Sequence, residues 1–384
     1  MLNALIRWSL NRRGLVLSLA TILVVSSAMI IPRMPVEVFP ELNAPTVTIM
    51  TEAPGYAPEE VERAVTFQIE TALNGIAGLR RLRSSSALGL SIVWAEFDFG
   101  ADVYRNRQLV AERLARIESS LPANIHPPEM TPVASLAGEI MLLGLTSPEG
   151  TVSPLELRRI AEFDLRPRLL AATGVAQVSA LGGELPEFQV RVRPGDLLRY
   201  GLSLSEVADA AKAAHAPVGA GYLPDVSGRE LPLRPDTRVR DSADISSTVV
   251  GQWRGAPVTL GQVADVGIAG APRRGTGSAG GQPAVILSVQ RNPGTNTIEL
   301  TSRIDSILSD FEKTLPKGIA LQRSIFRQAD FITVAVDNVL EALRDAAIFV
   351  LIILFLFLLN FRTTIITLTA LPLSLGMTLL LLNA

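Results

Sequence analysis

The stretch AAIFVLIILFLFLLNF, residues 346–361, decides the architecture of this chain. It carries no charged side chain, whereas Asp, Lys or Arg costs about 2.5–3.5 kcal/mol at the centre of a membrane helix. With the residues just before it, the run reaches the length that a bilayer requires and predicts a span over 336–361. After Arg362, residues 363–384 are again uncharged and predict a further span beyond a tight turn. We therefore expect the chain to be the front part of a longer membrane protein.

The N-terminus predicts another span. Arg7, Arg12 and Arg13 lie in an amphipathic segment, residues 1–13, and an uncharged run follows over 14–31. A cleaved signal peptide is the alternative, but the run is longer than a typical signal core, which favours an uncleaved span. The positive-inside rule places the arginines in the cytoplasm and the residues after the span outside the inner membrane.

The composition excludes several classes of protein. A length of 384 residues allows two or three domains. The formal net charge is −2 and no basic run occurs, which argues against a nucleic-acid partner. The absence of cysteine excludes disulfides, thiolate metal sites and cysteine nucleophiles.

The roughly 300 residues between the first two predicted spans contain an internal repeat. Helical patterns open at Pro58 and Pro154, and each ends about 20 residues later near a glycine, Gly75 in the first and Gly174 in the second. Proline suits the first turn of a helix, and glycine suits the position after its end. A sequence typical of a strand follows each helix, so both copies begin in the same way.

Each copy predicts the order strand–helix–strand–strand–helix–strand, a ferredoxin-like βαβ unit. The second helices are expected over 106–121 and 298–315, both ending in Leu-Pro. The first copy covers about 46–133. The second covers about 139–326, and an insert at about 186–272 separates its two halves.

The insert predicts a subdomain of its own. A strand over 188–192 precedes a helix over 205–214 that Ser203 caps. Two extended arms, 218–223 and 229–234, then predict a hairpin that cannot bury itself and is a candidate for reaching a neighbouring subunit. Its candidate contact residues are Val218, Gly219, Gly221, Tyr222 and Leu223.

A glycine motif at 275–280, GTGSAG, fits the G-x-G-x-x-G pattern of dinucleotide-binding proteins. That interpretation requires a preceding strand and a following helix. Here two arginines precede the motif and a strand over 284–289 follows it, so we interpret it as a flexible loop and expect no cofactor.

Four residues are candidate metal ligands. His126 and His215 are the only histidines, and neither has an acid or a second histidine at ligand spacing, so exposed structural roles are favoured. Met130 and Met141 flank the junction of the two repeats, and thioethers select copper(I) and silver(I). A pair so far apart is more typical of packing.

Acidic residues have structural explanations. Glu59, Glu60 and Glu62 lie in the first turns of a predicted helix, where carboxylates interact favourably with the helix dipole. Asp102, just beyond Asp98, is a candidate helix N-cap. With no nucleophilic triad, phosphate-binding loop or paired-carboxylate signature, we expect no enzyme active site.

A charged group precedes the second predicted span: Asp337, Glu341, Arg344 and Asp345. Buried within a membrane, such residues would be a proton relay. A solvated helix end is favoured, in which Glu341 and Arg344 or Asp345 pair along the helix.

Several segments resemble the resistance–nodulation–division efflux pumps, in particular the heavy-metal branch of cobalt–zinc–cadmium and copper–silver exporters. The resemblance covers essentially the whole chain in order. Its segments are 33–42 (RMPVEVFPEL), 53–62 (APGYAPEEVE), 174–176 (GVA) with 182–183 (GG), 200–207 (YGLSLSEV), 218–222 (VGAGY) and 353–357 (ILFLF). The assignment to the metal branch depends mainly on 40–42 (PEL) and 54–56 (PGY).

The resemblance implies membrane α-helical spans plus α+β periplasmic domains, with two ferredoxin-like βαβ porter subdomains and an inserted docking subdomain. It implies a proton-driven, homotrimeric pump in the inner membrane that works with a periplasmic adaptor and an outer-membrane channel. The implied boundaries are 1–13 cytoplasmic N-terminus, 14–31 transmembrane helix 1, 32–134 first porter subdomain, 135–185 and 273–335 the two halves of the second porter subdomain, 186–272 docking subdomain, 336–361 transmembrane helix 2, and 363–384 transmembrane helix 3.

The relay acids and metal ligands of that family lie beyond Ala384, so no transport or metal residue is carried over to this chain. Export of heavy-metal cations is the favoured function. Export of hydrophobic organic compounds is an alternative, against which the low aromatic content of 5% argues mildly. A membrane-anchored scaffold that binds partners without transporting is a third possibility.

Overall fold

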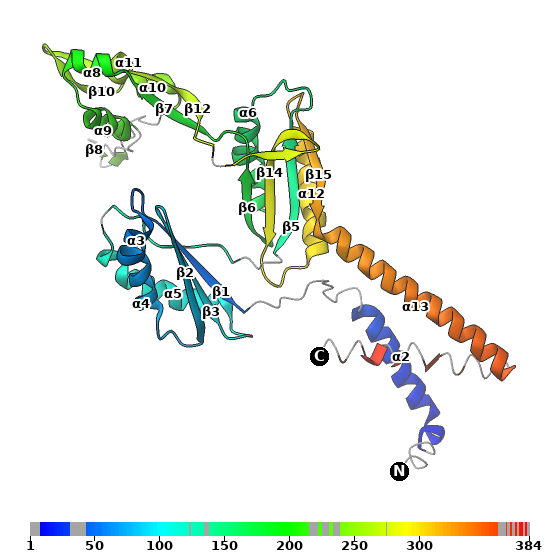
Figure 1. Ribbon diagram of the computed structural model, residues 1–384. Helices are drawn as coiled ribbons and strands as arrows, with labels where there is room; N and C mark the ends of the chain where they lie inside the picture. Colours follow the sequence, from blue (N-terminus) through cyan, green and yellow to red (C-terminus); the bar gives the residue numbers. More distant parts are fainter. Residues whose placement is uncertain are drawn as a thin grey trace.

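Three hydrophobic cores organise the part of the chain that the structure describes (Figure 1). The computed structural model describes residues 8–30, 44–122, 124–133, 138–214, 222–224, 230–232, 239–273 and 275–359, with short helical pieces between 366 and 381. Each core belongs to one α/β unit. We call them the first unit, the second unit and the inserted unit.

The first unit has the predicted ferredoxin-like topology. Its elements are β1 (Thr46–Glu52), α3 (Pro58–Val61), η2 (Glu62–Thr66), α4 (Phe67–Leu73), β2 (Leu79–Ala87), β3 (Leu90–Phe97), α5 (Val103–Ile117), η3 (Glu118–Ser120) and β4 (Glu129–Met130). The antiparallel sheet has the order β2-β3-β1-β4. Alternate residues of β3 point to the helices, which is why Val93, Ala95 and Phe97 form the core with Ile69 and Leu73.

The second unit repeats this topology around the insert. Its elements are β5 (Glu139–Thr146), α6 (Pro154–Arg159), η4 (Ile160–Leu165), α7 (Arg166–Leu170), β6 (Val175–Leu181), β13 (Gly277–Ala279), β14 (Gln282–Arg291), α12 (Thr297–Glu312) and β15 (Ala320–Arg327). Strand β14 pairs with β5 on one side and with β6 and β13 on the other, and β15 pairs with β5. The order β6-β14-β5-β15 is therefore equivalent to β2-β3-β1-β4 in the first unit.

The two units match at a constant spacing of 96 residues, from Pro58 and Pro154 to Gly78 and Gly174. Both first helices also contain a π-helical segment, and the two segments, η2 and η4, overlap when the units are matched at this spacing. The sequence analysis did not predict these segments, because one wider turn changes the hydrophobic spacing very little. π-Helical turns are rare and are frequent at functional sites, so their repetition identifies a shared feature of the two units.

The inserted unit has its own small core of Val207, Ile245, Val258, Leu260 and Val263. Its elements are β7 (Pro186–Val192), α8 (Pro194–Tyr200), α9 (Leu204–Ala214), β8 (Tyr222–Pro224), β9 (Glu230–Pro232), α10 (Ser242–Ser246), β10 (Val249–Trp253), β11 (Ala256–Thr259), α11 (Leu260–Val263) and β12 (Ala264–Gly270). The Ser203 hydroxyl accepts a hydrogen bond of 3.2 Å from the Glu206 amide, which confirms the predicted cap of α9.

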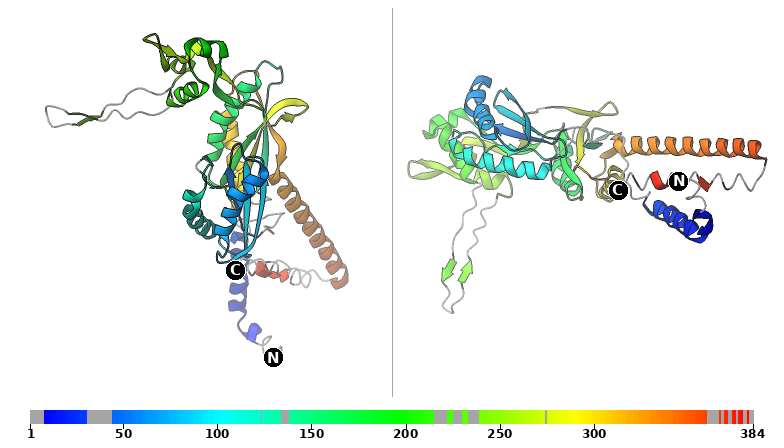
Figure 2. Two further views of the ribbon diagram at one scale, coloured as in Figure 1. Left: turned by 60° about the vertical axis from the view of Figure 1, so that its left-hand side comes forward. Right: turned by 90° about the horizontal axis from the view of Figure 1, so that it is seen from below.

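Two long helices stand apart from the three cores: α2 (Arg13–Ile30) and α13 (Gln328–Leu358) (Figure 2). Within the residues that the structure describes, no helix combines the length and the apolar character needed to cross a bilayer. The structure thus does not confirm the spans predicted over 14–31 and 336–361. Most of the third predicted span, 363–384, lies outside the described residues.

The predicted ion pairs along α13 are present. Arg344 donates hydrogen bonds to Glu341 at 3.1 Å and to Asp345 at 2.9 Å, and all three side chains are at least half exposed. Asp337 is exposed on the same helix. This arrangement confirms the predicted pairing along the helix.

Candidate functional site

The hairpin predicted to contact a neighbouring subunit is described in part. Strands β8 and β9 pair antiparallel, with Leu223 opposite Leu231, so the two extended arms do form a hairpin. Tyr222 begins β8. Val218, Gly219 and Gly221 lie outside the described residues, and the role of the hairpin stays a prediction.

The structure does not bring the two candidate methionines together. Met141 is fully buried in the core of the second unit, and Met130 packs against the core of the first. His126 is exposed and forms a surface pair of 3.4 Å with Glu52, while His215 lies outside the described residues. Among the described residues, no group of three His, Asp or Glu side chains is placed to hold a metal ion. The structure therefore gives Met130 and Met141 packing roles in different cores, as the sequence favoured.

The connection between the second and inserted units, here called the neck, depends on glycine. The chain leaves β6 through Gly182 and Gly183 and returns through Gly275 and Gly277. A Cβ atom on Gly182 would lie 2.7 Å from the amide nitrogen of Gly277 and 2.6 Å from the carbonyl oxygen of Ala284. Real Cβ atoms do not approach backbone this closely, so the two crossing segments require glycine.

This crossing explains the glycine motif at 275–280. The sequence predicted a flexible loop here, and this prediction is wrong. The motif contains β13 and opens the turn into β14, where Gly280 has a φ of +58° that favours glycine. Strand β14, rather than a helix, follows the motif, as the sequence predicted.

Polar contacts hold the neck against helix α6. Arg158 donates a hydrogen bond of 2.8 Å to the carbonyl of Gly182, and the Glu184 amide donates one of 3.3 Å to the carbonyl of Pro154. Arg273 pairs with the Glu184 carboxylate. The Arg158 side chain and the Glu184 amide thus tie the neck to α6, and the Arg273–Glu184 pair joins the two strands of the neck to each other.

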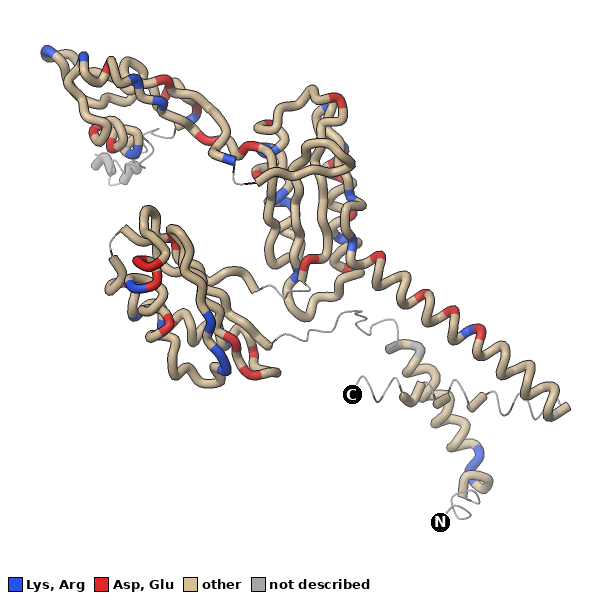
Figure 3. Tube along the Cα trace, viewed as in Figure 1, with Lys and Arg blue, Asp and Glu red and all other residues tan. Residues whose placement is uncertain are grey.

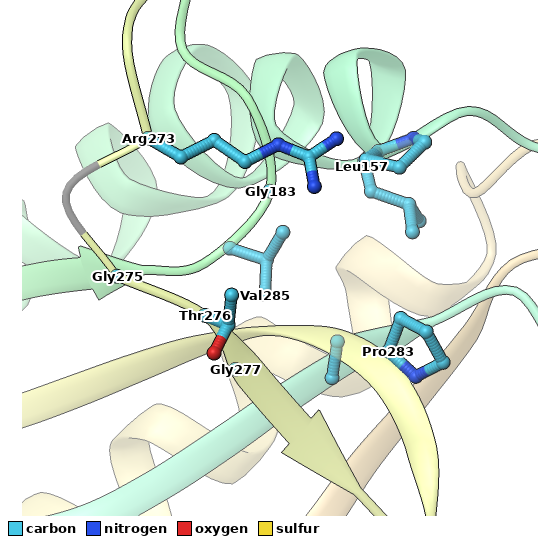
Figure 4. Close-up of a pocket in the computed structure, with 10 residues that line it drawn as sticks. Leu157, Gly183, Arg273, Gly275, Thr276, Gly277, Pro283 and Val285 are labelled. Atoms are coloured by element: carbon cyan, nitrogen blue, oxygen red, sulfur yellow. The ribbon is translucent and has the colours of Figure 1, made fainter.

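A cavity of about 90 Å³ lies beside these contacts. Its walls are mainly apolar, and Figure 4 shows the Arg273 side chain extending across it toward Leu157, with Val285 and Pro283 on the other side. The lining residues are Pro154, Leu157, Gly183, Arg273, Gly275, Thr276, Gly277, Pro283, Ala284 and Val285. Arg273 is the one charged side chain in this lining, so the cavity offers no acid–base pair for catalysis. We describe it as part of the joint between the second and inserted units.

A two-stranded ribbon of β7 and β12 extends from the neck. Val190 and Val266 form a cross-strand pair that packs on the core of the inserted unit. At the end of the ribbon, Arg193 is hydrogen-bonded to Asp196 and pairs with Asp265, and these carboxylates raise the pKa of the Arg193 guanidinium. The ribbon is therefore fixed at both ends.

A second joint connects the second unit to α13. Arg327 ends β15, and α13 begins at the next residue without a linker. Arg327 donates two hydrogen bonds to Asp305 in α12, and this carboxylate raises the pKa of the guanidinium. Ala329 and Ile332 bury the first turns of α13 against the unit. Sequence analysis missed this joint because Arg327 and Asp305 are 22 residues apart and share no motif.

The two joints attach α13 and the inserted unit to the second unit at separate places. Neither joint contains catalytic chemistry. Fixed helix attachment and a glycine-dependent crossing are suited to transmitting movement between parts of a protein.

Comparison with known proteins extends this description. The AcrB/AcrD/AcrF family model matches residues 5–384. Protein HelA of Legionella pneumophila is 33% identical over 383 residues, which cover 98% of this chain and 36% of HelA. The cobalt-zinc-cadmium resistance protein CzcA of Cupriavidus metallidurans is 32% identical, covering 89% of this chain and 32% of CzcA. The cation efflux system protein CusA of Escherichia coli strain K12 is 30% identical, covering 98% and 36%. The chain spans about a third of the length of these relatives.

Proposed function

Because the chain belongs to the AcrB/AcrD/AcrF family of resistance–nodulation–division transporters, we propose that it is the N-terminal part of a proton-driven pump that exports heavy-metal cations. The names of its relatives support this substrate class, since CzcA is a cobalt-zinc-cadmium resistance protein and CusA is a cation efflux system protein. The match over about a third of each relative supports its being a part.

The direct attachment of α13 to β15 carries the mechanistic part of the proposal. A pump that works by alternating access must couple events in the membrane to movement of its periplasmic units. We propose that the chain spans the inner membrane over 14–31, 336–361 and 363–384, with α2 and the distal half of α13 in the bilayer. The Arg327–Asp305 pair then transmits displacement of α13 to the second unit.

The proposed partners follow from the same family. The first and second units serve as porter subdomains and the inserted unit as a docking subdomain. The hairpin containing Val218, Gly219, Gly221, Tyr222 and Leu223 reaches a neighbouring copy in a homotrimer. A periplasmic adaptor and an outer-membrane channel complete a tripartite complex.

The test uses the complete protein that contains this chain, expressed in a bacterium without its own metal exporters. We expect higher tolerance to zinc, cobalt, cadmium, copper or silver. Everted vesicles should take up the same metal, and an uncoupler should abolish uptake by removing the proton gradient. Tolerance to hydrophobic dyes without tolerance to any metal would instead identify an exporter of organic compounds. The 384-residue chain alone is the negative control, since the family resemblance places the relay acids beyond residue 384.

A further inference from the structure

The end of the first unit at which β1 begins, here called the proximal end, carries exposed arginine and aromatic side chains. The sheet register fixes which residues share this end: Thr46 lies opposite Glu96, and Leu79 lies opposite Phe97. The turn after β3 and the start of α5 therefore lie here as well. The β2–β3 turn, with Leu88, lies at the opposite end.

Three arginines of β2 lie at or near the proximal end. The register shift between Leu79 and Arg81 makes Arg80 the additional residue of a β-bulge, a device that redirects a side chain. The Arg80 guanidinium lies 5.1 Å from the centre of the Phe99 ring. Arg81 and Arg83 remain 58% and 57% exposed although both bind Glu96.

Glu96 holds these two guanidiniums in place without covering them. It accepts hydrogen bonds of 2.9 and 3.0 Å from Arg81 and one of 2.5 Å from Arg83. An arginine has five N–H donors, so both keep donors directed to solvent. Arginine recognises phosphate through paired donors of this kind.

Aromatic residues accompany the arginines. Phe99 is 63% exposed and Tyr104, in the first turn of α5, is 59% exposed. The charged groups of this end are Arg80, Arg81, Arg83 and Arg105 against Glu96, Asp98 and Asp102, an excess of one positive charge. Figure 3 shows blue and red segments together at this end. Exposed aromatics beside arginine are typical of residues at a membrane–water interface.

The chain connectivity limits the distance between the proximal end and α2. Only 13 residues separate Ile30 from Ala44, and they span at most about 45 Å when fully extended. The opposite end of the sheet lies further from α2 along the chain, because the length of β1, roughly 20 Å, separates the two ends. If α2 lies in the bilayer, the proximal end is the part of the first unit that the tether holds toward it.

We propose that the proximal end of the first unit rests on the bilayer, where Arg80, Arg81 and Arg83 bind phospholipid phosphates and Phe99 and Tyr104 lie in the headgroup layer. This contact rests on the proposed placement of α2 in the membrane. The contact keeps the first unit fixed to the lipid surface while the second unit moves with α13.

The test uses the whole chain reconstituted into phosphatidylcholine vesicles, with and without phosphatidylglycerol, that contain lipids brominated near the headgroup. A Phe99→Trp variant reports contact by quenching of its emission, after subtraction of the parent chain. Leu88→Trp is the matched control, because Leu88 is 78% exposed at the opposite end of the same hairpin. We expect strong quenching at position 99 and none at position 88. Equal quenching, or none at position 99, would overturn the proposal.

The arginines are tested by Arg80→Gln in the Phe99→Trp chain, since the structure gives Arg80 an aromatic contact but no ion pair whose loss would unfold the unit. We expect the ratio of docked to undocked units in vesicles with phosphatidylglycerol to fall about fivefold for each arginine removed. Replacement of the exposed Arg116, near the end of α5 that lies away from the proximal end, by Gln is the control and should change nothing. Unchanged quenching without Arg80, Arg81 and Arg83 would refute phosphate binding.

Carbonate extraction separates this proposal from the proposed function. A chain that is extracted from the vesicles has no anchored α2, and both proposals then fail. A chain that resists extraction but shows no quenching at position 99 leaves the transporter proposal intact and overturns the lipid contact alone.

Discussion

Arg327, the last residue of β15, donates hydrogen bonds of 2.9 and 2.7 Å to the two carboxylate oxygens of Asp305 in α12. Side chains of 20% and 32% exposure make this pair largely protected from water. Since α13 begins at the next residue, the pair fixes the direction in which the longest described helix leaves the second unit.

Replacement of Arg327 by Gln should lower the free energy of unfolding of the second unit by about 1.5–3 kcal/mol, the usual range for hydrogen bonds to a charged group. Thermal unfolding in detergent measures the change. Lys313→Gln is the control, because Lys313 pairs with Asp310 on the surface, where ion pairs contribute at most about 1 kcal/mol. Equal effects of the two changes would contradict a special role for Arg327.

The structure of the neck leads to a second prediction, which concerns glycine. Gly277→Ala should destabilise the chain by about 1–3 kcal/mol, because the new Cβ would lie 2.6 Å from the carbonyl oxygen of Ala284. Gly267→Ala, in β12, meets no atom within 4 Å and should be neutral or slightly stabilising. Comparison of the two melting temperatures tests whether crowding at the crossing, and not glycine content, determines stability.

The topology of both units was predictable because its signals are local. Pro58 and Pro154 mark helix starts, and alternation marks the strands that follow. The neck was not predictable, since the need for glycine at position 182 arises partly from Gly277, 95 residues later in the chain. The flanking of the insert by Gly182-Gly183 and by the later glycine motif was the available signal. The Arg327–Asp305 pair had no such signal, because the two residues are 22 positions apart and share no motif.

The repeat predicts the same response in both units. Ile69 and Leu165 are fully buried and equivalent, so replacement of either by Ala should cost about 2–5 kcal/mol. Phe67 and Phe163 are also equivalent but are 64% and 57% exposed, so their replacement by Ala should change stability by no more than about 0.5 kcal/mol. Denaturant unfolding of the four variants tests the orientation of both π-containing helices. A large loss on removal of either phenylalanine would show that its face is covered.

Glu96 makes stability depend on pH. Hydrogen bonds from Arg81 are the main cause of its lowered pKa, with further contributions from the charges of both arginines. A carboxylate whose folded pKa lies below its ordinary value of 4.5 stabilises the fold above that pH and loses this contribution as the pH falls through the folded pKa. The stability difference between the parent and Glu96→Gln should therefore be constant at neutral pH and disappear in acid. A difference that persists at all pH values would exclude the ion pairs as its origin.

The proposed role of α13 leads to a prediction for the complete pump. Leu351→Pro should abolish metal transport, because proline removes a helix hydrogen bond, clashes with the preceding turn and costs about 3 kcal/mol in a helix interior. Leu351→Ala keeps the helix and is the matched control. Metal uptake into everted vesicles is the measurement, with the amount of pump in the membrane determined for each variant. If α13 transmits motion, Arg327→Gln should also reduce uptake, since it loosens the same helix at its other end. Full transport by a correctly inserted Leu351→Pro pump would show that movement reaches the second unit by another route.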